Sequence, residues 1–268
     1  MGDDRPIGIF DSGLGGLTVV NAMAKALPKE SFIYVGDTAR VPYGDKNADT
    51  IRMYGHQIIS FLQEKGVKAV IAACGTISSN VMEDLWKEFD LPIIDVVRPG
   101  IDACLDLCKA KNKKRVGVIA TEATIKSGFF QRTLKEKNPH LVIEAKACPL
   151  FVPLIEKGLT DNAAAVQIVE DCLKDWQHNP LDVLILGCTH YPLLSPILKQ
   201  VLGNDTVQVD MAVATLEVAA KVLTENNMLK KSNEAFSEFY VSGDTEKFNE
   251  MGRQITDTLI QSQKVFWK

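Results

Sequence analysis

Short apolar runs alternate with longer amphipathic segments along most of the chain. The apolar runs, such as VIAA at 70–73 and VLIL at 183–186, are continuous rather than alternating. Continuous runs of this length are typical of strands that are buried on both faces of a parallel sheet. The longer segments are typical of helices that cover such a sheet. The sequence therefore predicts an α/β protein in which strands and helices alternate.

The pattern divides the chain into two parts. The expected strands are 6–10, 31–35, 68–73, 92–96, 115–120, 141–147, 182–187, 207–210 and 238–243. The expected helices are 17–27, 48–65, one that begins near Thr76, 99–109, 128–136, 161–176, 192–201, 212–225 and 246–261. There are too many units for one compact sheet of usual size, and the pattern restarts near residue 98. We therefore expect two doubly wound domains with mainly parallel sheets, formed by 1–97 with 210–268 and by 98–209.

Composition and charge exclude several function classes. The chain has 268 residues and a formal net charge of −4, which gives no electrostatic footprint for nucleic acid or an anionic membrane. The basic run KNKKR at 111–115 is expected to be a solvated helix end or loop. No run approaches the roughly 18 apolar residues that a membrane span needs. The N-terminus lacks the pattern of a signal peptide, so we expect a cytoplasmic protein without nucleic-acid or membrane partners.

The six cysteines contain no C-x-x-C pair. Four of them are expected to be free structural thiols, because buried cysteine behaves as a small apolar residue: Cys104, Cys108, Cys148 and Cys172. A zinc site needs about four ligands at recognisable spacing. Cys188 and His190 are close in sequence, but nothing nearby completes such a set. We therefore expect no metal.

The remaining two cysteines occupy matching positions. Cys74 and Cys188 each follow a predicted strand and precede a threonine and a predicted helix. Ligands of open α/β sheets bind at the carboxyl ends of the strands. A helix N-terminus lowers the pKa of a thiol from about 8.5 towards 7, so we expect both thiols to exchange protons near neutral pH. If they face each other, they fit an inversion at a stereocentre, with a base on one face and an acid on the other.

A cysteine beside a histidine also suggests nucleophilic acyl transfer. Cys188 and His190 are the natural pair for that chemistry. We expect their side chains to point apart, however, and Cys74 would then have no role.

The turns after the strands are rich in hydroxyl groups and glycine. They are DSGLGG (11–16), DTARVPYG (37–44), CGT (74–76), TEAT (121–124) and CTH (188–190). Backbone N–H groups at helix N-termini bind carboxylates and phosphates, which favours a small anionic ligand. A dinucleotide fingerprint would need glycine at Thr18, and a Walker A lysine is absent. Helix capping alone is the other explanation for Asp11 and Ser12.

The motifs FDSGLGG, VPYG, PLIEKG and GCTHYP, in this order, closely resemble the glutamate racemase family within the aspartate/glutamate racemase superfamily. The resemblance extends from Pro6 to the C-terminal helices. It implies two pseudo-symmetric α/β domains with the active site in the cleft between them. It also implies the interconversion of L- and D-glutamate, which supplies D-glutamate for peptidoglycan, without pyridoxal phosphate or metal. Members of the family are often dimers, so we expect a homodimer.

The resemblance also implies roles for individual residues. Cys74 would act on the D-enantiomer and Cys188 on the L-enantiomer, assisted by Asp11, His190 and Glu156. The implied substrate-binding positions are Asp11, Ser12, Pro42, Tyr43, Gly44, Gly75, Thr76, Thr121, Thr189 and His190. Hydroxyl groups and N–H groups can hold the two carboxylates of glutamate, and a carboxylate can receive its ammonium group. A surface carboxylate without a catalytic role is the other explanation for Glu156.

Two positions depart from the family pattern. Gly75 stands where the family usually has an asparagine that binds the substrate, and Met211 stands where it usually has serine. We expect the second change to affect packing rather than chemistry. The first leaves two alternatives open: a racemase for another acidic amino acid such as aspartate, and a non-catalytic protein that binds small anions on the same fold.

Overall fold

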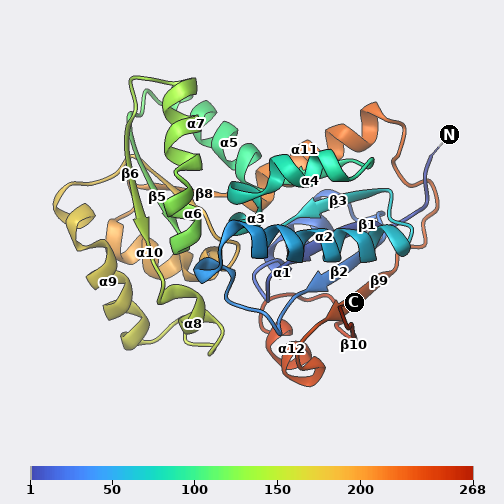
Figure 1. Ribbon diagram of the computed structural model, residues 1–268. Coiled ribbons are helices and arrows are strands. Elements are labelled where there is room, and N and C mark those ends of the chain that lie inside the picture. Colours follow the sequence, from blue (N-terminus) through green and yellow to red (C-terminus); the bar gives the residue numbers. More distant parts are fainter. Residues whose placement is uncertain (1, 268) are drawn as a thin grey trace.

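The computed structural model describes residues 2–267 and contains two sheets (Figure 1). The first has the strand order β10-β9-β2-β1-β3-β4, and the second has the order β6-β5-β7-β8. All strand pairs in both sheets are parallel. The predicted α/β class with parallel sheets is therefore confirmed.

The strands of the first sheet are β1 (Ile7–Asp11), β2 (Phe32–Gly36), β3 (Ala69–Ala72), β4 (Ile93–Asp95), β9 (Ser237–Val241) and β10 (Ser262–Lys264). Those of the second are β5 (Arg115–Ala120), β6 (Val142–Ala147), β7 (Val183–Leu186) and β8 (Val207–Asp210). The helices before β7 are α1 (Leu17–Ala26), η1 (Tyr43–Asp45), α2 (Ala48–Glu64), α3 (Gly75–Asn80), α4 (Met82–Glu88), α5 (Val97–Ala110), α6 (Glu122–Ser127), α7 (Phe129–Lys137), α8 (Phe151–Ile155) and α9 (Ala163–His178). After β7 come η2 (Tyr191–Leu194), α10 (Ser195–Leu202), α11 (Met211–Glu225) and α12 (Thr245–Gly252).

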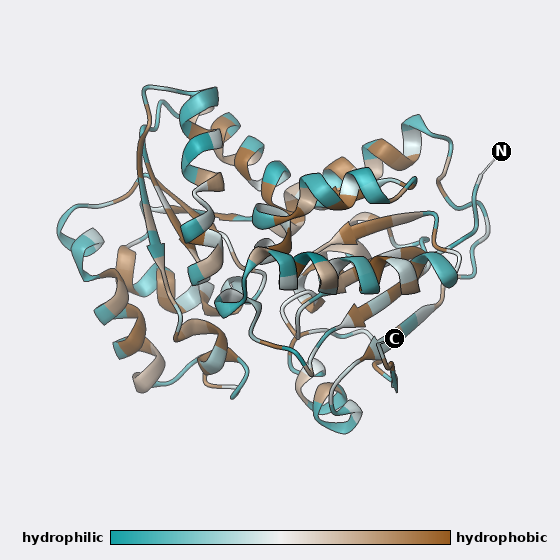
Figure 2. Cartoon of the chain, in the orientation of Figure 1, coloured by the Kyte–Doolittle hydropathy of each residue, from teal (hydrophilic) through white to brown (hydrophobic). Residues whose placement is uncertain are grey.

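Three apolar clusters form the core, and the strands of both sheets are largely hydrophobic in Figure 2. The largest cluster is shared by the two sheets: it joins Ile9 of β1 and Val118 of β5 through residues of α1, α5 and α11. A second cluster fills the other face of the first sheet, beneath α2, α3 and α4. The third fills the other face of the second sheet, beneath α8, α9 and α10. Each sheet is thus covered on both faces, as continuous apolar strands require.

The predicted helix 246–261 is wrong in its second half. Helix α12 ends at Gly252, and the chain then turns so that β10 pairs with β9 at the edge of the first sheet. This reversal buries Ile260 completely. A Cβ on Gly252 would lie only 2.4 Å from Cδ1 of Ile260, so the missing side chain permits the close packing. Burial of Ile260 therefore outweighs the helical pattern of the segment.

Two other segments differ from the expected pattern. The helix that begins near Thr76 is interrupted at Val81, whose φ of −134° and ψ of 5° lie outside the helical region, and so forms α3 and α4. The TEAT turn at 121–124 is largely the first turn of the short helix α6. The domain boundaries at 97/98 and 209/210 stay a prediction. Within residues 2–267, no helix has the length and apolar content that crossing a membrane requires.

Candidate active site

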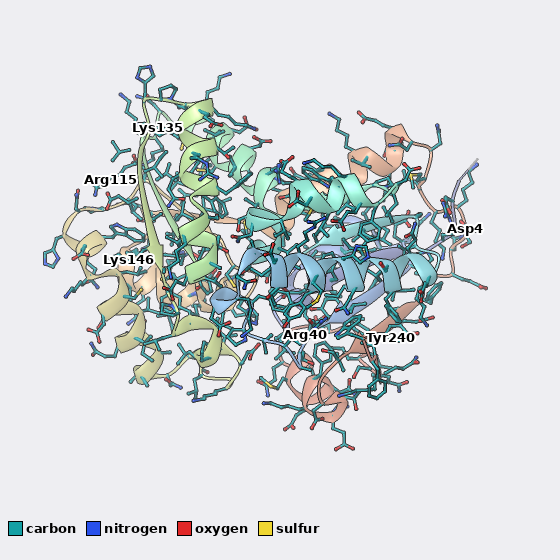
Figure 3. All side chains as sticks on the ribbon, in the orientation of Figure 1. Asp4, Arg40, Arg115, Lys135, Lys146 and Tyr240 are labelled. Carbon is teal, nitrogen blue, oxygen red and sulfur yellow. The ribbon has the colours of Figure 1, made fainter. Side chains whose placement is uncertain are left out.

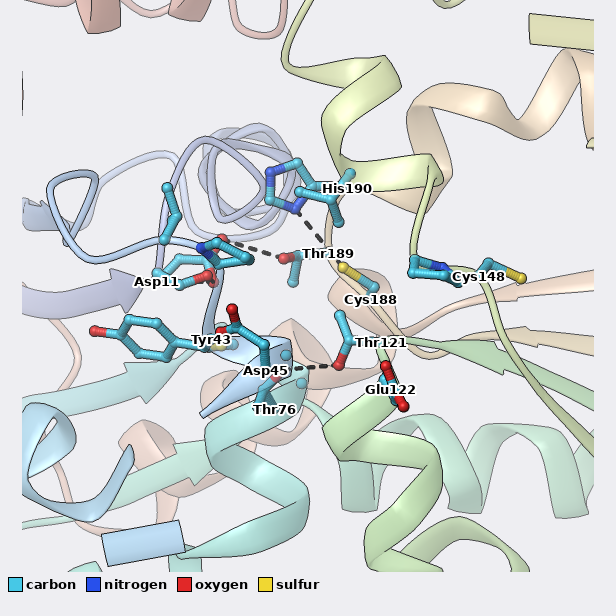
Figure 4. A pocket seen from close by; sticks show the side chains of 18 of the residues that line it. Asp11, Tyr43, Asp45, Thr76, Thr121, Glu122, Cys148, Cys188, Thr189 and His190 are labelled. Atoms are coloured by element: carbon cyan, nitrogen blue, oxygen red, sulfur yellow. Dashed lines mark hydrogen bonds between the residues drawn. The ribbon is translucent and has the colours of Figure 1, made fainter. Parts of the chain in front are cut away.

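A cavity of about 130 Å³ lies where strands of both sheets end, and Figure 4 shows its lining from close by. Among the expected site residues, those that line it are Asp11, Ser12, Pro42, Tyr43, Gly44, Cys74, Gly75, Thr76, Thr121, Cys188, Thr189 and His190. Glu156 does not line the cavity. Residues that line it without having been expected are Val41, Asp45, Glu122, Cys148, Pro149, Val152 and Pro153. Cys148 and Pro149 directly follow β6, and this position after a predicted strand could have identified them from the sequence.

Cys74 follows β3 and is the N-cap residue of α3, with its side chain buried. Burial raises the pKa of the Cys74 thiol well above its ordinary value, and the negative charge of Asp11 raises it further. A hydrogen bond with the backbone of Ile77 lowers this pKa but is outweighed. The expectation of a lowered pKa is therefore wrong for Cys74, because the cost of burying a thiolate exceeds the effect of one short helix N-terminus. The resting state of Cys74 near neutral pH is the thiol.

Cys188 follows β7 and shares its turn with His190. The Cys188 Sγ atom lies 3.7 Å from Nδ1 of His190, and Nε2 of His190 lies 3.3 Å from Oε1 of Glu156. The expectation that the Cys188 and His190 side chains point apart is wrong. Alternate residues of an extended chain share a face, and here the chain also turns, since His190 has helical φ and ψ.

The histidine links a thiol and a carboxylate. Burial alone would lower the pKa of His190, but hydrogen bonds with Cys188 and Glu156 outweigh it and raise that pKa to about 10. The imidazole is therefore protonated near neutral pH and can donate one N–H group to the sulfur and the other to the carboxylate. Glu156 thus contacts the lining of the cavity through His190 rather than lining the cavity itself.

Asp11 ends β1 and is almost fully buried. Its carboxylate accepts hydrogen bonds from the backbone N–H groups of Ser12 (2.8 Å) and Gly16 (2.5 Å) and from the Thr189 hydroxyl group (3.2 Å). The Thr18 hydroxyl group donates to the Thr189 carbonyl oxygen at 3.1 Å. These bonds fasten the turn after β1 to the turn after β7, so capping alone does not account for Asp11. Thr18 was not singled out from the sequence, because its partner is 171 residues away.

Three threonine hydroxyl groups meet on the opposite side of the cavity. The Thr76 and Thr121 Oγ1 atoms are 3.0 Å apart, and Thr121 Oγ1 is also 3.0 Å from Thr124 Oγ1. Thr76 lies on α3 of the first sheet, whereas the other two lie at the start of α6 beside the second. The group therefore bridges the two halves of the cavity. Thr124 is fully buried and was not predicted, since the sequence did not show that α3 and α6 meet.

Gly75 lies at a close approach of the two halves. A Cβ atom at this position would lie 2.5 Å from the carbonyl oxygen of Gly187, the residue before Cys188. Such a contact is far shorter than van der Waals packing allows, and its partner is backbone rather than a flexible side chain. In this chain the two turns that carry the cysteines therefore approach so closely that a side chain at Gly75 would force one of them to shift.

The cavity combines these parts into one chemical arrangement. It presents a thiol from each sheet, one beside a protonated histidine, together with hydroxyl and N–H groups suited to carboxylates. The negative charge of a Cys188 thiolate would raise the pKa of Cys74 further, so the two sulfurs interact electrostatically across the cavity. Within the described part of the chain, no group of three or more His, Cys, Asp or Glu side chains is placed to hold a metal ion.

Comparison with known proteins gives a consistent result. The model of the family described as Asp/Glu/Hydantoin racemase matches residues 7–219. The chain is 43% identical over 263 residues to "Glutamate racemase 2" of Caldanaerobacter subterraneus, covering 96% of this chain and 97% of that protein. It is 40% identical over 256 residues to the glutamate racemase of Neisseria meningitidis, covering 95% and 93% of the two chains.

Solved structures are similar over nearly the whole chain. The glutamate racemase of Francisella tularensis in complex with D-glutamate has a TM-score of 0.89 and 35% identity, and 98% of each chain is covered. An aspartate racemase of Picrophilus torridus has a TM-score of 0.58 and 17% identity, with 82% of this chain and 94% of that chain covered. At this identity, the likeness to the aspartate enzyme concerns the fold alone.

Proposed function

Because the chain belongs to the Asp/Glu/Hydantoin racemase family, we propose that it interconverts L- and D-glutamate with Cys74 and Cys188 as an acid/base pair. The observation that carries this proposal is one cavity with a cysteine at the end of a strand from each sheet. Nucleophilic acyl transfer would use the Cys188–His190 contact but would leave Cys74, buried in the same cavity, without a role.

In the direction from L to D, the Cys188 thiolate removes the Cα proton of L-glutamate, and the Cys74 thiol delivers a proton to the opposite face. The raised pKa of Cys74 keeps this donor protonated near neutral pH. In the direction from D to L the two thiols exchange roles. Protonated His190 is placed to donate a hydrogen bond toward the sulfur of Cys188.

Substrate contacts follow from the polar groups of the lining. The threonine hydroxyl groups at 76 and 121 and the turn at Ser12 are suited to carboxylates, and the buried carboxylate of Asp11 is suited to the ammonium group. The similar proteins between 36% and 43% identity are named glutamate racemases, which favours glutamate over aspartate. Gly75 does not offer the side-chain contact that the resemblance implies at this position, so aspartate stays the alternative to test.

We further propose that the D-glutamate produced is used for peptidoglycan and that the protein acts in the cytoplasm as a homodimer. The reaction as proposed needs neither pyridoxal phosphate nor a metal. Treatment with a chelator is therefore expected to leave the rate unchanged, and a loss of activity that added metal restores would contradict this part of the proposal.

The experiment that tests the function is racemisation in deuterated water. Either enantiomer of glutamate should acquire deuterium at Cα, and its circular dichroism should decay to zero. Since enantiomers have equal free energy, kcat/KM must be equal in the two directions, which serves as an internal check. Exchange with aspartate but not with glutamate would contradict the substrate assignment, and exchange with neither would favour a non-catalytic protein that binds anions.

A further inference from the structure

Two cysteines outside the proposed mechanism lie in contact. Cys148 directly follows β6, and Cys172 lies on α9; their Sγ atoms are 3.1 Å apart. Both are free thiols. Since a disulfide bond is about 2.05 Å long, closing the remaining gap needs a movement of about 1 Å. We propose that Cys148 and Cys172 are a modification site, a dithiol that hydroperoxides oxidise reversibly to a disulfide.

The two thiols differ in access and in charge. Cys172 is partly exposed, whereas Cys148 is almost fully buried. A hydrogen bond with Cys148 lowers the pKa of Cys172, and the same bond raises the pKa of Cys148 well above its ordinary value. Lys146, labelled on β6 in Figure 3, adds a positive charge that favours both thiolates. Cys172 is therefore the more accessible thiol, and the one whose ionisation is favoured, so it reacts first; Cys148 is the thiol in contact with it.

The site is connected to the cavity through Cys148. The carbonyl oxygen of Cys148 accepts a hydrogen bond of 3.0 Å from the Tyr191 hydroxyl group, and Tyr191 directly follows His190. In Figure 4 the sulfur of Cys148 points away from Cys188. A disulfide would thus tie one wall of the cavity to α9 without using either thiol of the proposed acid/base pair.

The chemistry balances with a hydroperoxide as the oxidant. The Cys172 thiolate attacks one peroxide oxygen, so that an S–O bond forms, the O–O bond breaks and, with hydrogen peroxide, a water molecule leaves after protonation. The Cys148 sulfur then attacks the sulfenic sulfur. An S–S bond forms, the S–O bond breaks, and a second water leaves with the proton of Cys148. Two electrons pass from the sulfurs to the peroxide, and a reducing thiol reverses the reaction.

The test detects the disulfide bond itself, in the full-length wild-type protein. After treatment with hydrogen peroxide, two of the six thiols should be lost, and the intact mass should fall by the mass of two hydrogen atoms. Peptide mapping should find Cys148 linked to Cys172, and dithiothreitol should restore both thiols. Because the readout is covalent, it is independent of racemase activity. No cross-linked peptide, or Cys172 oxidised to the sulfinic acid beside free Cys148, would overturn the proposal.

Two variants test whether the disulfide forms specifically between Cys148 and Cys172. Cys172→Ser should abolish the cross-link and leave Cys148 reduced. The matched control is Cys104→Ser, since Cys104 and Cys108 lie one helical turn apart and are both buried in α5. Burial raises the pKa of each of these two thiols, so neither is an activated thiolate. The control should cross-link as the wild type does. A disulfide between Cys104 and Cys108 that forms as readily would show that proximity alone governs the oxidation, against the proposal.

Discussion

At the scale of single residues, the two thiols make separate and opposite predictions. Cys74→Ala and Cys188→Ala should each reduce racemisation by about 10²- to 10⁴-fold, since each removes the acid or base on one face of Cα. Deuterium exchange should survive on one enantiomer only: L-glutamate with Cys74→Ala, and D-glutamate with Cys188→Ala. Mass spectrometry of the separated enantiomers measures this. Normal racemisation by either variant would contradict the two-base assignment.

The raised pKa of His190 predicts that the stability of the folded protein depends on pH. Its pKa in the folded protein, about 10, lies above the ordinary value of 6.5. Protonation of His190 therefore stabilises the fold fully below about pH 6.5, and this contribution is lost as the pH rises through about 10. Glu156→Gln should lower the pKa of His190 towards its ordinary value, because it removes the negative charge at Nε2.

NMR titration of the imidazole nitrogens measures this pKa directly. Glu122→Gln is the matched control, because the Glu122 carboxylate lines the cavity but pairs with Lys126 rather than with His190. An imidazole of unchanged pKa in Glu156→Gln would show that Glu156 does not act through His190.

The close contact at Gly75 predicts that a single added methyl group reduces the rate of racemisation. The Cβ atom of Gly75→Ala would clash with the Gly187 carbonyl oxygen, 2.5 Å away, and would push apart the turns that carry the two thiols. A displacement of 1 Å at reacting groups costs about 10²-fold in rate, so kcat should fall by that order while the protein stays folded. The control is Gly55→Ala, whose Cβ would meet only a flexible side chain, that of Leu85. Unchanged kcat in Gly75→Ala would show that the two halves adjust freely.

Most of the residues that line the cavity were predictable from the sequence, because residues that follow parallel strands converge at one edge of the sheet. Features that depend on tertiary burial were not predictable. The raised pKa of Cys74 comes mainly from desolvation, which depends on segments far from it in the sequence. Thr124 joins Thr121 and Thr76 only because α3 and α6 meet. Neither feature has a local pattern.

At the scale of elements, the loop 37–44 is held in place by hydrogen bonds to one buried carboxylate, that of Asp37. The Asp37 carboxylate accepts hydrogen bonds from the hydroxyl groups of Tyr43 and of Ser242, which follows β9 (2.6 Å for Ser242). It also accepts one from the Trp267 indole N–H group (2.8 Å) and forms an ion pair with Arg40 at 2.6 Å. Pro42 and Gly44 of the same loop line the cavity. The C-terminal segment thus helps to position a wall of the candidate active site.

Asp37→Asn should destabilise both the fold and this wall. It leaves the guanidinium of Arg40 without a buried partner charge, which costs about 3 kcal/mol. The KM for glutamate should rise several-fold, with a smaller effect on kcat, because the loop holds substrate rather than exchanging protons. Urea unfolding and steady-state kinetics measure the two effects. Tyr43→Phe removes one of the hydrogen bonds and should cost only about 1.5 kcal/mol. Equal effects of the two variants would contradict the central role of the carboxylate.

Most strands were predictable because doubly buried strands give continuous apolar runs, which do not depend on context. The end of the chain was not. Strand β10 has only three residues, none of them apolar, and its place beside β9 is set by the burial of Ile260 against Gly252. A short polar edge strand gives no periodic signal, so the helical pattern of 246–261 was extended too far.

At the scale of the whole molecule, the sequence pattern predicts two domains, but the largest part of the core is shared by both sheets. The largest apolar cluster contains strands of both sheets joined through α5 and α11. Met211 at the start of α11 belongs to this cluster, and a Cβ on Gly100 of α5 would lie 2.6 Å from its Cγ atom. The departure from the family's serine at this position is therefore a packing contact between helices that join the sheets, as the sequence led us to expect.

This shared core predicts that the two sheets unfold together. Calorimetry should show a single cooperative transition, and Met211→Ala should shift the whole of it to lower temperature, with a loss of about 2–4 kcal/mol for the vacated volume. Since Met211 does not line the cavity, kcat should be retained at temperatures below the transition. The control is Val213→Ala on the same helix, where the side chain is 56% exposed and its loss should change little. Two separate transitions, only one of them shifted by Met211→Ala, would show that the two sheets unfold independently. The common core would then not set the geometry of the cavity.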